Sequence, residues 1–120
     1  MLTPSTQLSM REMRKRGYLV GKTEYWNSFT HHRVDLWGIL DFLCLRSGEI
    51  VGLQTTSYTN IAGHRQKILQ SITVIPILQS GMRLLLQGWK KGKTGRWELK
   101  EEEYVLDEQG KNVLIKESIC

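Results

Sequence analysis

Asp41 and Gln54 bracket a segment whose pattern predicts a tight β-hairpin, and both carry side-chain oxygens. Two apolar stretches flank Ser47 and Gly48, which together suit a two-residue turn. If the turn centres on this pair, residues equally far from it face each other, so Asp41 and Gln54 are cross-strand neighbours with Cβ atoms about 5 Å apart. Oxygen ligands in this arrangement can hold a hard cation such as Mg²⁺. The pair is therefore the centre of a candidate metal site.

Two further carboxylates bear on this site. In a continuous strand Asp35 shares a face with Asp41, but six residues of extended chain place the two about 20 Å apart. One metal ion cannot span that distance unless Gly38 breaks the strand, so we expect Asp35 to be a strand-end or structural carboxylate. A hairpin between the first two strands could place Glu24 near Asp35, giving neighbouring carboxylates with a raised pKa or a shared ion. A solvated strand glutamate is an equal alternative for Glu24, and an exposed strand position is the alternative for Asp41.

Basic residues gather in two clusters, one on a predicted N-terminal helix and one at a hairpin tip between two tryptophans. The clusters are Arg11, Arg14, Lys15 and Arg16, and then Lys90, Lys91, Lys93 and Arg96 between Trp89 and Trp97. A basic tip beside aromatic rings suits a nucleic-acid backbone with base stacking. The alternatives are a solvated turn above two core tryptophans and a solvated helix face. With a net charge of +5 and a pI of about 9.4, the two clusters favour a DNA or RNA partner.

Composition sets the frame for these sites. A chain of 120 residues, 40% hydrophobic and 24% charged, is expected to form one soluble domain. No apolar run reaches the length of about 18 residues that a membrane span needs. The N-terminus lacks the order of a signal peptide, so we expect a cytoplasmic protein. Cys44 is expected to be a small core residue, and neither it nor Cys120 belongs to a cluster typical of zinc.

The periodicity predicts the elements that must position these residues. A helix is expected from Pro4 to about Arg16, with Gly17 ending it. Strands are expected at 18–26, 34–45 and 50–56, helices at 61–72 and 74–78, and strands at 82–89 and 96–106. This order, α-β-β-β-α-α-β-β, predicts an α/β fold with a mixed central sheet flanked by helices. We expect a single domain over 1–120, with a core at about 5–106 and a peripheral tail at 107–120.

The order α-β-β-β-α-β resembles the core of the PD-(D/E)XK nuclease superfamily, within which the archaeal Holliday junction resolvases look closest. Asp41 matches the family's Asp on the second strand, and Gln54-Thr55-Thr56 falls where Glu-x-Lys stands on the third. Residues 34–42 and 52–57 also resemble small phage-type proteins assigned to this superfamily. The resemblance covers roughly residues 5 to 90 and implies a restriction-endonuclease-like fold.

The chain departs from the family's motif at two positions on the third strand. Gln54 in place of Glu keeps an oxygen ligand without its charge, which should weaken Mg²⁺ binding. Thr56 replaces the Lys that in the family positions the attacking water and stabilises charge on the phosphate. Arg65 and Lys67, on the following helix, are the natural substitutes for that Lys.

The family's Glu on the first helix has no match either. Thr6 or Gln7 lies nearest its expected place. Glu24 or Glu12 is left to supply that carboxylate.

The resemblance implies a DNA endonuclease, resolvase-like on branched DNA, that hydrolyses phosphodiester bonds with water activated by Mg²⁺ or Mn²⁺. Asp41 is the expected central metal ligand and Gln54 the second, and a homodimer is expected. The catalytic set is Asp41, Gln54, Thr56, Lys67 and Glu24, and the nucleic-acid-binding set is Arg11, Arg14, Lys15, Arg65, Lys90, Lys91, Lys93 and Arg96. One alternative is an inactive nucleic-acid-binding module that keeps the nuclease fold. Another is a small structural or partner-binding protein in which Asp41 and Gln54 only share a cross-strand hydrogen bond.

Overall fold

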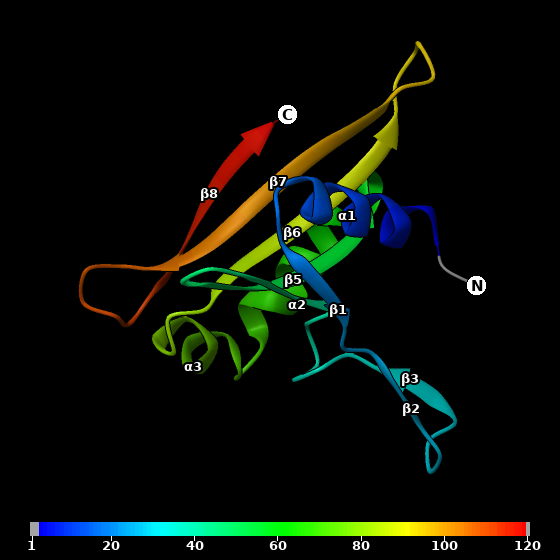
Figure 1. Ribbon diagram of the computed structural model, residues 1–120. Helices are drawn as coiled ribbons and strands as arrows, with labels where there is room; N and C mark the ends of the chain where they lie inside the picture. The colour runs from blue at the N-terminus through cyan, green and yellow to red at the C-terminus, as the bar shows by residue number, and fades with distance from the viewer. Residues whose placement is uncertain (1–2, 120) are drawn as a thin grey trace.

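Six strands form one mixed sheet in the order β1-β4-β5-β6-β7-β8 in the computed structural model, which describes residues 3–119 (Figure 1). The strands are β1 (Leu19–Lys22), β4 (Phe42–Arg46), β5 (Glu49–Ser57), β6 (Arg83–Lys91), β7 (Trp97–Leu106) and β8 (Val113–Ile119). β5 and β6 run parallel, and the other neighbouring pairs are antiparallel. The prediction of an α/β fold with a mixed central sheet is confirmed.

Helices cover both faces of this sheet. They are α1 (Pro4–Lys15), a short 3₁₀ turn η1 (Tyr58–Asn60), α2 (Ile61–Gln70) and α3 (Val74–Gln79). On β6, Leu84 and Leu86 pack in the cluster that holds the buried residues of α2 and α3. Leu85 packs in the other cluster, with Met13 of α1. Because successive strand residues point to opposite faces, α1 lies on one side of the sheet and the other two helices on the other side.

The predicted first helix forms with the expected caps. The side chain of Thr3 accepts the N–H of Thr6, and Pro4 occupies the first turn, where its missing N–H is not needed. At the other end, Gly17 has φ +94° and its N–H bonds to Arg14 O, while Tyr18 N–H bonds to Met13 O. This left-handed glycine ends the helix and turns the chain into β1.

The parallel pair β5–β6 needs a crossover, which η1, α2 and α3 provide. Gly88 on β6 permits close packing of α2, because a Cβ at this position would lie 2.2 Å from Cδ1 of Ile61. The crossover therefore fixes the height of α2 above β5, and with it the position of the polar side chains on the first turns of that helix.

The hairpin register is as predicted. β4 pairs with β5 from Phe42–Leu53 to Arg46–Glu49, around a turn in which Gly48 has φ +72°. The ladder stops one residue short of Asp41, which lies just before β4 rather than inside it. The N–H of Asp41 still donates to Leu53 O at 2.8 Å, so the chain enters β4 in register.

Two predicted strands are broken. Both predictions were wrong because residues 23–41 do not belong to the main sheet. Instead of one strand over 18–26, β1 ends at Lys22 and β2 (Tyr25–Asn27) pairs with β3 (His32–Val34) in a separate two-stranded sheet. Instead of one strand over 34–45, residues 35–41 form a turn. Trp37 (φ +52°) and Gly38 (φ +79°) are left-handed there, and Leu36 and Leu40 pair across the turn.

The β2–β3 ribbon, as we call residues 25–34, projects from the body of the molecule in Figure 1. Residues 23–41 therefore lie outside the main sheet: the chain leaves the sheet after β1 and returns to it at β4.

The end of the chain also differs from the expectation. Val113–Ile119 is not a peripheral tail but the sheet edge strand β8, paired with β7. Cys44 is fully buried, as expected of a core residue, whereas Cys120 lies outside the described residues. Trp89 is buried, but Trp97 is 42% exposed and is not a core residue. None of the helices within residues 3–119 is both long and apolar enough to cross a membrane.

Candidate metal centre

Three carboxylates, those of Glu24, Asp35 and Asp41, meet at the root of the β2–β3 ribbon. Each offers an oxygen within 4.8 Å of the others, and all three residues are half-buried. The ribbon pairs Tyr25 with Val34, so Glu24 and Asp35, one residue further out, are brought side by side where the two strands end. The turn over 35–41 then folds the chain back and places Asp41 against them.

This geometry confirms that Glu24 lies near Asp35 and corrects the expectation for Asp35 itself. The separation of about 20 Å assumed a continuous strand. The structure breaks that strand at Trp37 and Gly38, which is the condition under which Asp35 could join Asp41. Glu24, rather than Glu12, accompanies Asp41, since Glu12 pairs with Arg16 at 2.8 Å on α1.

Backbone hydrogen bonds hold Asp41 in place. Its carboxylate Oδ2 accepts the N–H of Thr55 at 2.8 Å, and its carbonyl oxygen accepts the N–H of Thr23 at 2.9 Å. Burial, with the charge of Asp35 and a hydrogen bond to it, raises the pKa of Asp41 to about 7, while the Thr55 N–H and Lys67 oppose the shift. The Asp35–Asp41 pair therefore tends to keep a proton near neutral pH when no cation is bound.

Cationic side chains flank the three carboxylates. Nζ of Lys67 on α2 lies 3.1 Å from Oδ2 of Asp35, and the Lys67 side chain is 45% exposed. Nη1 of Arg33 lies 3.3 Å from Oε1 of Glu24. Arg65 instead contacts Glu102 through Nε and Nη2, at 3.0 and 2.5 Å. Of the two candidates to replace the family's Lys, the structure brings Lys67 to the carboxylates.

Gln54 is fully buried, and both ends of its amide are bonded. Nε2 donates to the carbonyl of Ile39 at 2.8 Å, and Oε1 lies 3.0 Å from Nδ1 of His64. The expected role of Gln54 as the second metal ligand stays a prediction, since these contacts engage its amide without testing metal binding. In this arrangement Gln54 joins the 35–41 turn to α2 and orients a histidine.

Sequence reasoning missed His64. Its Nδ1–H donates to Gln54 in the tautomer that fits this pair, which leaves Nε2 as an acceptor when the ring is neutral. Burial and the charge of Lys67 lower the pKa of His64, and Asp35 opposes them. The available signal was its spacing, because His64 and Lys67 lie one helical turn apart and share a face of α2.

Thr56 is buried and, two residues beyond Gln54, faces the same side of β5. Thr55 faces the other side, where its hydroxyl lies 2.7 Å from the Ser9 hydroxyl of α1. α1 thus braces the strand that holds Asp41 without placing a carboxylate at the cluster. Beside the cluster, Thr59, Asn60, Gly63, His64 and Lys67 line a hollow of 400 Å³.

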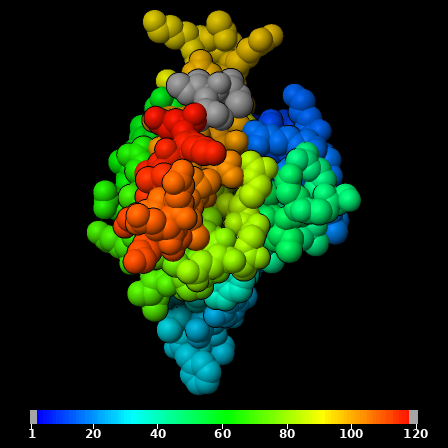
Figure 2. Space-filling model, turned by 90° about the vertical axis from the view of Figure 1, so that its left-hand side faces the viewer, coloured from blue at the N-terminus to red at the C-terminus, as the bar shows by residue number. Residues whose placement is uncertain are grey.

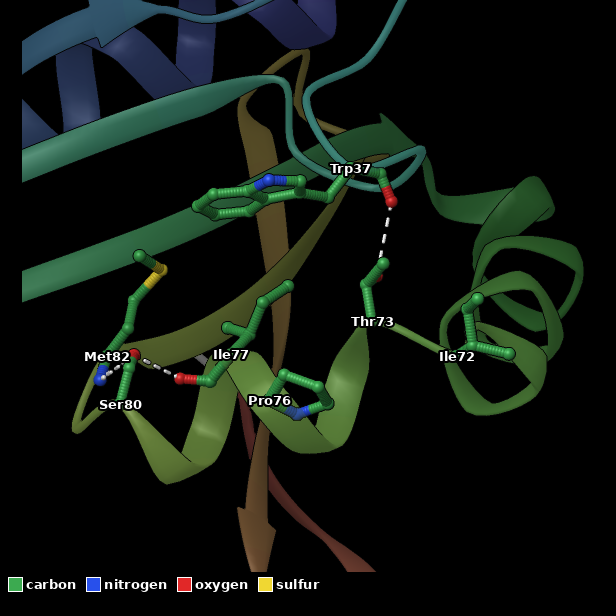
Figure 3. A pocket seen from close by; sticks show the side chains of 7 residues that line it. All are labelled: Trp37, Ile72, Thr73, Pro76, Ile77, Ser80 and Met82. Carbon is green, nitrogen blue, oxygen red and sulfur yellow. Dashed lines mark hydrogen bonds between the residues drawn. The ribbon is translucent and has the colours of Figure 1, made fainter.

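An apolar pocket lies on the far side of the 35–41 turn, shown in Figure 3. Its volume is 520 Å³, and its lining residues are Trp37, Ile72, Thr73, Pro76, Ile77, Ser80 and Met82. The hydroxyl of Thr73 donates to the carbonyl of Trp37 at 3.1 Å. The lining carries no titratable side chain, and the hydrogen bond from Thr73 supports the left-handed Trp37 in the turn between Asp35 and Asp41.

The predicted nucleic-acid contacts divide between several surfaces. Arg11, Arg14 and Lys15 are exposed on α1, as are Lys90, Lys91, Lys93 and Arg96 at the β6–β7 hairpin. Nζ of Lys90 lies 4.3 Å from the centre of the Tyr58 ring and 3.7 Å from Glu98, and Nζ of Lys91 lies 5.6 Å from the Trp97 ring. Figure 2 shows this hairpin tip and the β2–β3 ribbon at opposite ends of the molecule. The basic hairpin is thus remote from the end at which the carboxylates lie.

No family model, curated protein or solved structure is significantly similar to this chain. The functional argument therefore stands on the geometry of the site.

Proposed function

We propose that this chain is a metal-dependent nuclease that hydrolyses phosphodiester bonds in DNA. The observation that carries the proposal is the meeting of Glu24, Asp35 and Asp41 within 4.8 Å. The net charge of +5 and the exposed basic clusters support a polyanionic substrate.

The three carboxylates fit a divalent cation. Carboxylate oxygens are the ligands that Mg²⁺ and Mn²⁺ prefer. Burial, and after it the neighbouring charge of Asp35, raises the pKa of Asp41, and a bound cation would favour the ionised carboxylate. Glu24, Asp35 and Asp41 would hold the ion. When bound, Mg²⁺ or Mn²⁺ would supply a water of lowered pKa and neutralise charge on the phosphate.

The surrounding side chains have separate tasks in this proposal. Thr55 and Thr23 fix Asp41 through the backbone. Lys67 is exposed on the hollow beside the carboxylates, where it can meet a phosphate oxygen and stabilise the charge that develops on it. Gln54 keeps His64 turned toward the same hollow, with Nε2 free to accept or hold a proton.

The PD-(D/E)XK resemblance belongs to this proposal. It is supported by the succession α1, β1, β4, β5, α2, β6, in which the third and fourth strands are parallel neighbours joined by helices. Asp41, just before β4, and Gln54, on β5, also support the resemblance to the family's motif. A restriction-endonuclease-like fold, action on branched DNA and a homodimer are parts of the same proposal.

Two observations favour the alternative of an inactive DNA-binding module. The amide of Gln54 is bonded at both ends, and Thr56 brings no cation to the site. Under this alternative the three carboxylates bind an ion that serves structure or DNA binding, and no bond is hydrolysed.

Nicking of supercoiled plasmid by wild type and by Asp41→Asn, Asp35→Asn and Glu24→Gln, with Mg²⁺, Mn²⁺ or EDTA, separates these functions. Glu108→Gln, an exposed carboxylate between β7 and β8, is the matched control. We expect metal-dependent nicking that Asp41→Asn abolishes and Glu108→Gln leaves intact. DNA binding without nicking supports the inactive module. Nicking that survives both EDTA and Asp41→Asn, in protein free of contaminating nuclease, rules out this site.

A further inference from the structure

The β2–β3 ribbon stands apart from the sheet and buries little of its own apolar surface. It forms a separate two-stranded sheet and projects at one end of the molecule (Figures 1 and 2). A two-stranded hairpin gains little stability by itself. Its large side chains nevertheless face solvent, with Tyr25 52%, Trp26 58% and Phe29 94% exposed. Exposed aromatic surface on a projecting arm is typical of a contact with another molecule.

The tip of the ribbon holds Phe29 outward through its own hydrogen bonds. Oδ1 of Asn27 accepts the N–H of Phe29 at 2.9 Å and the N–H of Thr30 at 3.3 Å. The carbonyl of Asn27 accepts the N–H of His31 at 2.9 Å, and His31 is left-handed, with φ +56°. The ring of Trp26 meets the His31 ring edge-on, with centroids 6.2 Å apart. The turn is thus built to present one aromatic side chain.

The charge of the ribbon selects the kind of partner. Residues 25–34 contain no Asp or Glu, and they include Arg33, His31 and His32, all of which are exposed. The exposed N–H donors of these side chains suit the phosphate oxygens of a polyanion, whereas residues 25–34 of a second copy offer no carboxylate to accept from them.

The root of the ribbon is the candidate metal centre. Glu24 precedes β2 directly, and Asp35 follows β3 directly. Three extended residues of β2 span about 10 Å from the root, and the turn over 28–31 carries Phe29 beyond them. A two-stranded ribbon fits a major groove about 12 Å wide and 8.5 Å deep. A duplex with one phosphate at the carboxylates therefore has its base pairs within reach of Phe29.

We propose that the β2–β3 ribbon enters a groove of double-stranded DNA and inserts Phe29 as a wedge at a base step. This inference rests on the proposed function. The substrate of the proposed nuclease would then be duplex DNA with a weakened base step. Apolar side chains that enter a base step must unstack it. A nick lowers the energy of unstacking, so the wedge gives a preference for nicked over intact duplex.

The test compares wild type with Phe29→Ala, Phe29→Leu and Ile72→Ala. Ile72 lies between α2 and α3 and is 93% exposed, so Ile72→Ala is a matched control for loss of exposed apolar surface. The probes are one duplex sequence, intact or nicked, with 2-aminopurine at the nick, and Ca²⁺ as the only divalent cation. Affinity is measured by anisotropy, unstacking by 2-aminopurine fluorescence, and folding by thermal melting.

We expect wild type to bind the nicked duplex about tenfold more tightly than the intact one and to raise 2-aminopurine fluorescence. Phe29→Ala should lose both effects with an unchanged melting temperature, Phe29→Leu should keep part of them, and Ile72→Ala should keep both. A Phe29→Ala variant that keeps the preference and the fluorescence rise overturns the wedge.

Two further outcomes separate the inference from the proposed function. If Phe29→Ala keeps the preference while wild type nicks plasmid with Mg²⁺, the wedge is wrong and the nuclease stands. If the preference depends on Phe29 but no variant nicks plasmid, the wedge stands on a binding module. A wild-type dimer that Phe29→Ala dissociates, with DNA binding unchanged, makes the ribbon an arm for self-association and overturns the wedge.

Discussion

Nζ of Lys67 lies 3.1 Å from Oδ2 of Asp35 and joins α2 to the turn that holds the three carboxylates. The contact joins an ammonium group that lines the neighbouring hollow to a carboxylate that is proposed to bind metal. It also places Lys67 where the electric field of the ammonium group lowers the pKa of Asp41. In the proposed nuclease, Lys67 would therefore supply from a helix the cation that the PD-(D/E)XK motif places on a strand.

Lys67→Met tests whether Lys67 takes the place of the lysine of the PD-(D/E)XK motif. We expect nicking to fall about 10²-fold, since one group that stabilises charge in the transition state is lost. The unfolding free energy should change by less than about 1 kcal/mol, because the Lys67 side chain is 45% exposed and its ion pair is screened by solvent. Lys111→Met, at an exposed position before β8, is the control and should keep nicking within a few fold. A Lys67→Met enzyme of wild-type rate would remove Lys67 from the chemistry.

Asp41 should make folding stability depend on pH in an unusual direction. Its pKa of about 7 in the folded protein is raised above the ordinary 3.8, so between about pH 4 and 7 the folded state binds more protons than the unfolded state. Stability from this group is present below that window and is lost as pH rises through 7, by about 2–4 kcal/mol. Denaturant unfolding at pH 5 and 8 measures it. Asp41→Asn should flatten the difference, whereas Glu108→Gln should leave it unchanged.

The local parts of this fold are predictable from the sequence. Ser47-Gly48 sets the β4–β5 register, and Thr3, Pro4 and Gly17 set the ends of α1, because each signal acts on its immediate neighbours. The meeting of the three carboxylates, in contrast, depends on residues far apart in the sequence. Residues 34–40 carry a nearly continuous apolar pattern that reads as strand. The break at Trp37 depends on Thr73 and on an apolar pocket formed by α3, which lie more than thirty residues away in the sequence.

The difference between local signals and long-range contacts also explains which site residues the sequence analysis found and which it missed. Asp41 was found because a carboxylate in an apolar segment is conspicuous by itself. His64 was missed because a single histidine gains its meaning only from Gln54 Oε1, ten residues away in the sequence on β5. Asp35 was rejected by a distance that was correct for a strand and wrong for a turn.

Replacing Lys90, Lys91 and Lys93 together by Ala tests the basic hairpin. If these side chains contact phosphates, DNA affinity should fall and the slope of log affinity against log salt should decrease by about two to three units. Lys90 is the weakest contributor, since it already contacts Tyr58 and Glu98. Lys111→Ala with Lys116→Ala removes two other exposed lysines as a control for net charge. Equal slopes for the wild type and the triple variant would take this hairpin out of the interface.

Gln54→Glu should affect metal affinity and folding stability in opposite directions. A carboxylate here adds negative charge beside Asp41 and His64, so we expect tighter Mg²⁺ and Mn²⁺ binding by calorimetry. The carbonyl of Ile39 loses the N–H donor that it has at 2.8 Å, and an unpaired buried acceptor costs about 1–3 kcal/mol. The metal-free variant should therefore unfold at lower denaturant concentration, and added metal should restore more stability to it than to wild type.

Gln87→Glu is the matched control for this experiment, because Gln87 is equally buried but lies on β6 beside Glu101. It should destabilise the protein without changing metal affinity. Combining Gln54→Glu with Thr56→Lys introduces the Glu and Lys of the PD-(D/E)XK motif and should raise nicking above wild type if the site is catalytic. If neither wild type nor Gln54→Glu binds Mg²⁺ or Mn²⁺, the three carboxylates are not a metal site, and the chain is better explained as a DNA-binding module without hydrolysis.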